Sequence, residues 1–193
     1  MEKSGNQPDC FSSVQLIFLR SIRAYLLTKL FFLTFFLLGS YSASSQNRTL
    51  DSLQALVKVT TNDTLKANLF NQISKQYLYD FNNLEKMKQY AAQAIHLSQP
   101  HNHKKGLAYG YIYFGIYYYN QANYDYALNY YTKSLKLLEE LNDLKGMGSA
   151  YLNIGSIYGS RGDYNKALTF MLKAVKFKEE AKDERGTSAA YNN

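Results

Sequence analysis

Residues 150–180 read AYLNIGSIYGSRGDYNKALTFMLKAVKFKEE, and residues 110–140, 40 positions earlier, read GYIYFGIYYYNQANYDYALNYYTKSLKLLEE. When the chain is shifted by 40, 16 of the 48 residue pairs between 106–153 and 146–193 are identical. A period of 20 to 50 residues is typical of repeat architectures, in which each unit is one supersecondary structure stacked on the next. The sequence therefore predicts a solenoid with a 40-residue unit.

Each unit contains two segments with the periodicity of a helix. In the unit that starts at Ala108, large apolar residues recur at helical spacing in both segments: Tyr111, Phe114 and Tyr118, then Tyr124, Leu128, Tyr131 and Leu135. Residues 120–123 and 160–163 are of the types that end one helix and cap the next. Small residues let the two helices approach closely: Gly115, Gly155, Ala127 and Ala167. The predicted fold is all-α, an α-solenoid of stacked antiparallel helix hairpins.

A less regular unit precedes these two. Its first helix would carry Phe70, Ile73 and Tyr77, and its second Met87 and Ala91, with one extra residue in the turn near 81–83. Apolar spacing over residues 50–59 predicts a short capping helix, and Asp51 and Asp63 are expected to cap helices. The predicted division is a leader at 1–45, a linker and capping helix at 46–65, and repeats at 66–193. The repeats comprise about three units and a fourth that stops at Asn193, so the chain is interpreted as a fragment.

The first 45 residues have the features of an export leader. The apolar run LFFLTFFLL at 30–38 follows Arg20, Arg23 and Lys29, and the small polar stretch GSYSASSQ follows the run. The run is shorter than the roughly 20 residues that span a bilayer. We therefore expect a signal peptide and export to the periplasm, with Gln46 as the mature N-terminus. The alternative is a membrane anchor through residues 24–41.

Charge and composition exclude several classes of function. The net charge is +7, but acidic and basic residues alternate along the chain, so no nucleic-acid partner is expected. The single cysteine, Cys10, permits no disulfide and no thiol pair. Three histidines lie near Pro100 without acidic or cysteine neighbours, and we expect a solvated turn in place of a metal site: His96, His101 and His103.

The sequence shows no motif for catalysis or for a cofactor. No glycine-rich phosphate loop and no nucleophile motif is present. Three glycines recur with the period of the repeat and are interpreted as turn residues between hairpins: Gly106, Gly146 and Gly186. We expect neither an enzyme nor a bound cofactor.

The repeat pattern resembles the tetratricopeptide repeat, in which an aromatic, Leu-Gly, Tyr, Ala, an aromatic and Ala follow at fixed spacing. One unit has Tyr111, Phe114, Gly115, Tyr118, Ala127, Tyr131 and Ser134 at these positions, and the next has Tyr151, Ile154, Gly155, Tyr158, Ala167, Met171 and Ala174. The period of 40, longer than the usual 34, resembles the repeat regions of exported or membrane-bound signalling proteins of the Bacteroidota. In those proteins the repeats precede a membrane helix and a kinase, cyclase or DNA-binding regulator domain.

The resemblance implies a concave groove, lined by the first helix of each hairpin, that binds a protein or peptide. The implied groove residues are Asn71, Lys75, Tyr109, Ile112, Tyr113, Ile116, Tyr119 and Asn153. Tyr113 and Tyr119 are expected to be exposed, although such tyrosines can also pack between neighbouring first helices. The family's clamp for a C-terminal carboxylate is not expected, because Ile112 and Ile116 occupy two of its positions.

The expected function is that of a non-catalytic scaffold that binds a protein or peptide and is exported across the inner membrane. The alternative is the truncated sensory input region of a membrane signalling protein, with a histidine kinase, nucleotide cyclase or transcriptional regulator as its output. The chain is expected to meet the membrane only through its leader or through a missing downstream anchor.

Overall fold

The computed structural model describes residues 27–30 and 48–191, and the chain divides into two units, Met1–Thr49 and Leu50–Asn193. In the first unit, residues 27–30 are helical. The predicted signal peptide, its predicted cleavage point and the anchor alternative at 24–41 otherwise lie outside the described residues. In the ranges that are described, no helix combines the length and the apolar character needed to cross a bilayer.

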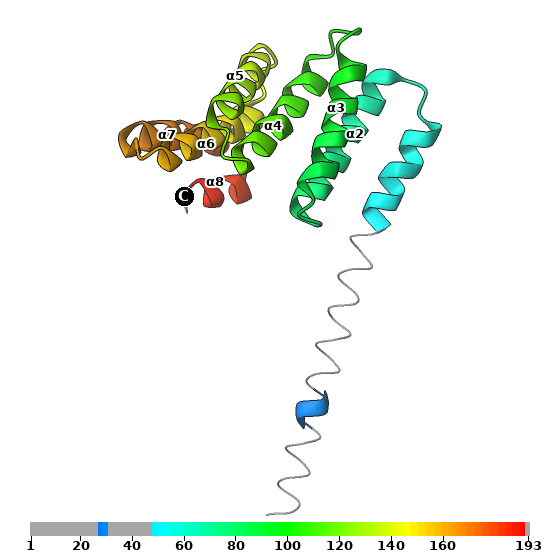
Figure 1. Cartoon of the computed structure of the whole chain (residues 1–193), viewed down its shortest axis with the longest axis horizontal. Helices are drawn as coiled ribbons and strands as arrows, with labels where there is room; N and C mark the ends of the chain where they lie inside the picture. Colours follow the sequence, from blue (N-terminus) through cyan, green and yellow to red (C-terminus); the bar gives the residue numbers. More distant parts are fainter. Residues whose placement is uncertain (1–26, 31–47, 192–193) are drawn as a thin grey trace, which may run out of the picture. The chain divides into compact units, whose positions relative to one another are not determined.

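The described part of the second unit is built of helices, and it contains no strand (Figure 1). Residues 48–59 are helical, where the spacing of Leu50 to Val59 predicted a capping helix. The helices that follow are α2 (Asp63–Tyr79), α3 (Leu84–Ser98), α4 (Lys104–Asn120), α5 (Tyr124–Glu140), α6 (Leu144–Ser160), α7 (Tyr164–Glu180) and α8 (Glu184–Tyr191). They stack as successive hairpins, so the predicted all-α solenoid is confirmed.

The 40-residue period has a simple structural origin in helix and turn lengths. From α4 to α7 every helix has 17 residues, and three residues join each helix to the next. A residue with positive φ recurs every 20 positions, at Asn82, Asn102, Ala122, Asn142, Gly162 and Lys182. The backbone N–H of the residue that follows donates a hydrogen bond to a carbonyl near the end of the preceding helix. For example, the Asp163 N–H donates to the Tyr158 carbonyl oxygen at 2.9 Å. This is the left-handed helix termination in which glycine is usual.

The residue after the positive-φ residue is the N-cap of the next helix, and at α3, α5, α6 and α7 its side chain makes the capping bond. The side chains of Asn123, Asp143 and Asp163 accept a hydrogen bond from the backbone N–H three residues later, as the polar turns predicted. At α2 the N-cap is Asn62, whereas the sequence analysis expected Asp63. Asp63 instead accepts from His101 Nε2 at 3.1 Å, because it already lies in the first helical turn.

The prediction that Gly106, Gly146 and Gly186 are turn residues is wrong. They lie in the first turns of α4, α6 and α8, while other residues supply the positive φ of the turns. A Cβ atom at Gly146 would lie 2.5 Å from a methyl carbon of Leu138, and one at Gly106 would overlap the Ser98 hydroxyl. Glycine is needed there because the preceding helix approaches closely, and not because of backbone conformation.

Inside each hairpin, small residues on one helix receive large side chains from the other. Gly115 lies against the Tyr131 ring, which is 1% exposed, and Gly155 lies against Met171 and the Ala167 carbonyl. Ala127 is fully buried. The close approach predicted from these small residues is confirmed, and it makes each hairpin a tightly packed unit.

The first hairpin departs from this regularity. Residues 80–83 join α2 to α3, one more than the three residues that join α4 to α5, so the extra turn residue predicted near 81–83 is present. The helix α2 begins at Asp63, three residues before the predicted start of the repeats at 66. The hydrophobic core of the first hairpin includes Phe70 together with Leu50 and Leu53 of the capping helix. The capping helix therefore packs onto the first hairpin.

The stack of helices is curved. Each first helix contacts the next first helix, α2 with α4, α4 with α6 and α6 with α8, whereas α3, α5 and α7 do not contact one another in the described chain. Elements on the inner side of a curve lie closest together. The first helices therefore form the inner surface, which we call the concave face, and the second helices form the outer surface, the convex face.

Candidate functional site

The predicted groove residues all lie on first helices: two on α2, five on α4 and one on α6. Their exposure differs. Lys75 is exposed, while Tyr109, Ile116, Tyr119 and Asn153 are half-buried. Asn71, Ile112 and Tyr113 are buried, with only 7%, 6% and 7% of their surface exposed. Two of the five groove residues expected on α4, Ile112 and Tyr113, are therefore in the interior.

Two of the half-buried tyrosines connect α4 to α6. The Tyr109 hydroxyl donates to Asp143 Oδ2 at 2.8 Å, immediately before α6 begins. The Tyr119 hydroxyl lies 2.9 Å from Ser160 Oγ at the other end of α6. Burial, followed by the Asp143 hydrogen bond, raises the pKa of Tyr109. These two side chains pack between neighbouring first helices, which was the alternative interpretation of the tyrosines.

Tyr113 belongs to the hydrophobic core of the first hairpin, so the expectation that it is exposed is wrong. It packs with Phe70, Ile73 and Tyr77 of α2. Burial raises its pKa, and the neighbouring Tyr79 and Tyr109 add to the shift. Its position was misjudged because a regular repeat places it on the groove, whereas the divergent first hairpin covers most of its ring.

The concave face contains a hollow of about 250 Å³ between α2 and α4. It brings together four of the predicted residues and leaves out Ile112, Ile116, Tyr119 and Asn153. Lys105, which the sequence analysis did not select, also contributes. It lies before the first position of its repeat unit, but it precedes Tyr109 by four residues on α4 and is therefore on the same face of that helix. The lining residues are Asn68, Asn71, Gln72, Lys75, Lys105, Tyr109 and Tyr113.

Two amides and a histidine organise the polar surface near this hollow. Asn71 Nδ2 donates to the Gly106 carbonyl at 2.9 Å, while Asn71 Oδ1 is buried and has no hydrogen-bond partner in the structure. His103 Nε2 donates to Asn68 Oδ1 at 2.9 Å. Burial, with the charges of Lys105 and His101, lowers the pKa of His103, so its ring is neutral at pH 7.

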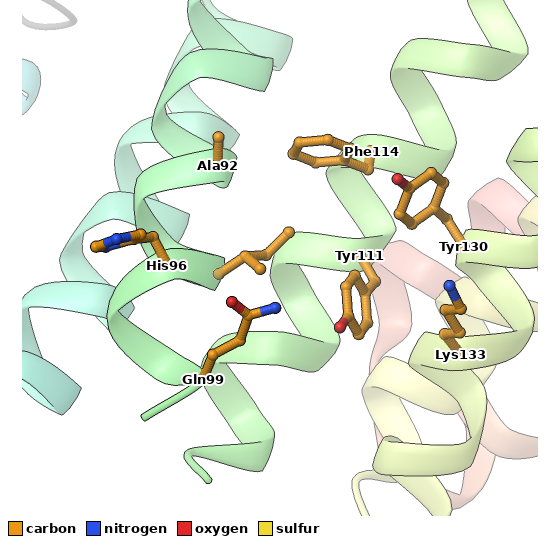
Figure 2. A pocket seen from close by; sticks show the side chains of 8 residues that line it. Ala92, His96, Gln99, Tyr111, Phe114, Tyr130 and Lys133 are labelled. Carbon is orange, nitrogen blue, oxygen red and sulfur yellow. The ribbon is translucent and has the colours of Figure 1, made fainter. Parts of the chain in front are cut away.

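A second pocket, of about 380 Å³, lies between α3, α4 and α5 on the convex face (Figure 2). Tyr130 forms its aromatic side, with ring centroids 5.3 Å from Phe114 and 6.0 Å from Tyr111. His96 on α3 and Gln99, the residue after α3, lie across from these rings. No motif predicted this pocket, because its residues come from three helices at spacings that also suit ordinary packing.

The described residues offer no group of three or more His, Cys, Asp or Glu side chains that could hold a metal ion. Of the histidines in the α3–α4 turn, His101 pairs with Asp63 and His103 with Asn68. Both contacts join this turn to α2, which is a structural role.

The geometry defines a class of protein: an α-solenoid of helical hairpins with a concave inner surface. Residues 106–180 match the family model described as tetratricopeptide repeat. The repeats within residues 106–180 are tetratricopeptide repeats. No curated protein matches the sequence.

Solved structures with the same fold include three whose sequences are distant. Aspartyl phosphate phosphatase F from Bacillus subtilis has a TM-score of 0.62 and 23% identity, over 72% of this chain and 36% of that one. A signal transduction ATPase with a tetratricopeptide repeat sensor from Pyrococcus horikoshii has a TM-score of 0.59 and 20% identity, over 77% of this chain and 23% of that one. BtubC from P. vanneervenii has a TM-score of 0.54 and 16% identity, over 79% of this chain and 65% of that one. The chain thus spans only part of each of these proteins, and the likeness concerns the fold.

Proposed function

We propose that this chain is a non-catalytic scaffold that binds a segment of another protein on its concave face. The observation that carries the proposal is the hollow between α2 and α4, where the side chains of Gln72, Lys75 and Lys105 are exposed. Tetratricopeptide repeats generally mediate interactions between proteins. The concave face concentrates side chains from several first helices on one surface, and an extended segment can contact them in succession.

The chemistry of the described residues favours binding over catalysis. Burial raises the pKa of the Tyr113 and Tyr131 hydroxyls, so these phenols remain neutral at pH 7 and cannot serve as bases. Asp143 is occupied by two hydrogen bonds, one from Tyr109 and one from the Gly146 N–H. The fold is typically a non-catalytic scaffold, and these groups contribute hydrogen bonds and area to it.

The side chains around the hollow suit an extended partner segment. Asn68 and Gln72 lie on one side and the ring of Tyr109 on the other. Amides can donate to and accept from the partner's backbone, while a tyrosine ring supplies contact area at low entropic cost. We therefore expect backbone hydrogen bonds to contribute affinity and pockets in the hollow to select side chains.

The proposal can be tested by selecting a random linear peptide library on the purified full chain. The site of each recovered peptide is then mapped by amide hydrogen exchange. Protection in α2 and α4, extending to α6, supports the proposal. Protection confined to α3, α5 and α7 would place binding on the convex face and contradict it. Failure to recover any peptide above background would also contradict it.

We also propose that the protein is exported, and that the concave face is the sensory input of a larger signalling protein. The leader sequence supports export, and the architecture resembles a solved ATPase that carries a tetratricopeptide repeat sensor. N-terminal sequencing of the mature protein tests export: Gln46 as the first residue supports it, and an intact leader contradicts it. Sequencing the gene downstream of Asn193 tests the signalling proposal, which requires a membrane helix and an output domain there.

A further inference from the structure

The hollow between α2 and α4 contains two lysines that lack a carboxylate partner. Lys75 and Lys105 are exposed and line the hollow, and neither forms an ion pair with any described residue. The adjacent Lys104 differs, because its Nζ lies 3.0 Å from Glu140. The two lysines that face the concave surface are thus available to an outside anion.

One acidic group, Asp143, contacts the lining residue Tyr109, and its two oxygens are engaged there. Asp143 lies beside Tyr109, but its Oδ2 accepts from the Tyr109 hydroxyl and its Oδ1 from the Gly146 N–H, at 2.8 and 2.9 Å. No acidic residue lines the hollow itself. With two lysines against the single carboxylate of Asp143, the local charge is net positive, and it favours a negatively charged occupant.

The start of α4 adds to this positive potential. Its N-cap, His103, makes no side-chain capping bond, and its first turn contains Lys104 and Lys105 without an acidic residue. By contrast, Asn or Asp side chains cap α2, α3, α5, α6 and α7. Positive side chains beside the positive end of a helix dipole are unfavourable, and an incoming anion would relieve that repulsion.

Asn71 provides an independent indication of a binding site. It is 7% exposed, and its Oδ1 accepts no hydrogen bond. A buried acceptor without a donor is uncommon and costs free energy. Because Asn71 lines the same hollow, a backbone N–H of a bound peptide would supply the missing donor once the peptide enters between the lysines.

We propose that this hollow receives an Asp or Glu side chain from within a bound peptide, with the carboxylate held between Lys75 and Lys105. The inference rests on the proposed function and specifies the partner as an acidic segment. It differs from a clamp for a C-terminal carboxylate, because the charged group is a side chain and the contacts come from α2 and the start of α4.

The test uses peptides recovered from the library, synthesised with amidated C-termini, and fluorescence anisotropy with the full chain. We expect an Asp or Glu at one fixed position. Replacing it by Asn or Gln should weaken binding about tenfold, the loss typical of a charged hydrogen bond. The variant K75Q/K105Q should bind the original peptide about tenfold more weakly as well. Combining the peptide substitution with K75Q/K105Q should weaken binding little further than either change alone. Added salt should weaken binding only between the original peptide and the unmodified protein.

A matched control is K58Q/K136Q, which removes the same charge from two exposed lysines outside the hollow. It should bind normally, and circular dichroism should show that both double variants are folded. Peptides that protect α2 and α4 but need no acidic residue would overturn this inference and leave the proposed function intact. Acid dependence that survives K75Q/K105Q would also overturn it. Protection confined to the convex face, or no binding at all, would contradict both this inference and the proposed function.

Discussion

The second repeat (α4 and α5) and the third (α6 and α7) have equal helix lengths and equal turns, yet they fill equivalent positions with different side chains. At Gly115 the second helix contributes the ring of Tyr131, whereas at Gly155 it contributes the flexible Met171. A hypothetical Cβ at Gly115 would overlap the ring, and one at Gly155 would approach Met171 Cγ to 3.0 Å. The second repeat is therefore packed more tightly at the helix crossing.

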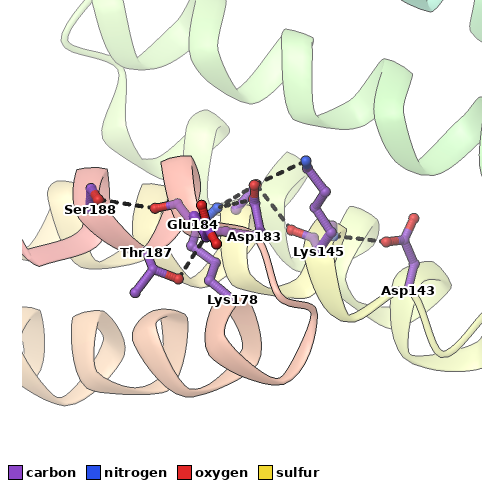
Figure 3. Close-up of polar contacts among 9 residues, drawn as sticks. Asp143, Lys145, Lys178, Asp183, Glu184, Thr187 and Ser188 are labelled. Carbon is purple, nitrogen blue, oxygen red and sulfur yellow. Dashed lines mark hydrogen bonds and ion pairs between the residues drawn. The ribbon is translucent and has the colours of Figure 1, made fainter.

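The contact with the following first helix differs even more. Leu138 of the second repeat is fully buried, and Lys178 takes the equivalent position in the third, only 4% exposed. Lys178 Nζ donates to Ser149 Oγ at 3.2 Å and lies 3.7 Å from Asp183 Oδ2 (Figure 3). Lys145 Nζ reaches the other Asp183 oxygen at 3.1 Å.

The charges in this cluster depend on one another. Burial lowers the pKa of Lys178, and Asp183 offsets part of that shift. Burial alone would raise the pKa of Asp183, but hydrogen bonding and charge from Lys145, together with Lys178 and the Gly186 N–H, bring it below its ordinary value. The comparison teaches that turns and close-approach positions define the repeat, while an apolar or an ionic contact can join consecutive repeats.

The largest expected effect is at the helix crossings. Gly115→Ala should destabilise the protein by about 3 kcal/mol, because the buried Tyr131 ring cannot move aside without strain. Gly155→Ala should cost about 1 kcal/mol, because Met171 can change rotamer and alanine favours a helix, whereas the Ala167 carbonyl oxygen stays 3.2 Å from the new Cβ. Urea unfolding followed by circular dichroism measures both. Equal losses would show that the two crossings do not differ as described.

The ionic contact can be broken by Asp183→Ala. This change leaves Lys178 buried without its carboxylate and should destabilise the third repeat by about 2 kcal/mol. The matched change Asp143→Ala removes a helix cap and the Tyr109 partner and should cost about 1 kcal/mol. Thermal unfolding of the two variants provides the comparison. A smaller loss for D183A than for D143A would argue against a buried pair at Lys178.

Lys178→Leu would give the third repeat the side chain that the second already uses. We expect a gain of about 1 kcal/mol near pH 7, since apolar replacement of a buried charge is often stabilising. The lowered pKa of Lys178 means that the cost of its buried charge is fully present below that pKa and disappears as pH rises towards 10.5. The advantage of K178L should therefore shrink at alkaline pH in urea unfolding. A gain that is independent of pH would contradict this account.

The smallest expected effects concern the turns. Ala122 has φ of 55° and its equivalent, Gly162, has 77°. Ala122→Gly should stabilise the protein by about 0.5 kcal/mol, because it removes strain at a left-handed residue. Gly162→Ala should destabilise it by about 1 kcal/mol. Differential scanning calorimetry measures whether each variant unfolds at a higher or a lower temperature than the original protein. A loss of stability in A122G would show that the strain at Ala122 is absent.

The repeat pattern predicted the hairpins because it depends on local rules. The 40-residue shift, the small residues at Gly115 and Gly155, and the caps at Asn123 and Asp163 each indicate a structure that neighbouring residues decide. The candidate site was less predictable. Tyr113 lies in the core because the irregular first hairpin covers it, and Lys105 lines the hollow because it lies one helical turn before Tyr109 on the same face of α4.

The sequence by itself determined that the chain forms antiparallel helix pairs, since periodicity, small residues and turn residues act over a few helical turns and recur in every unit. Only the tertiary structure decided which side chains remain available on the concave face. That outcome depends on how adjacent helices of unequal regularity pack, and on which polar groups, such as Asp143 and Tyr109, satisfy one another across that contact.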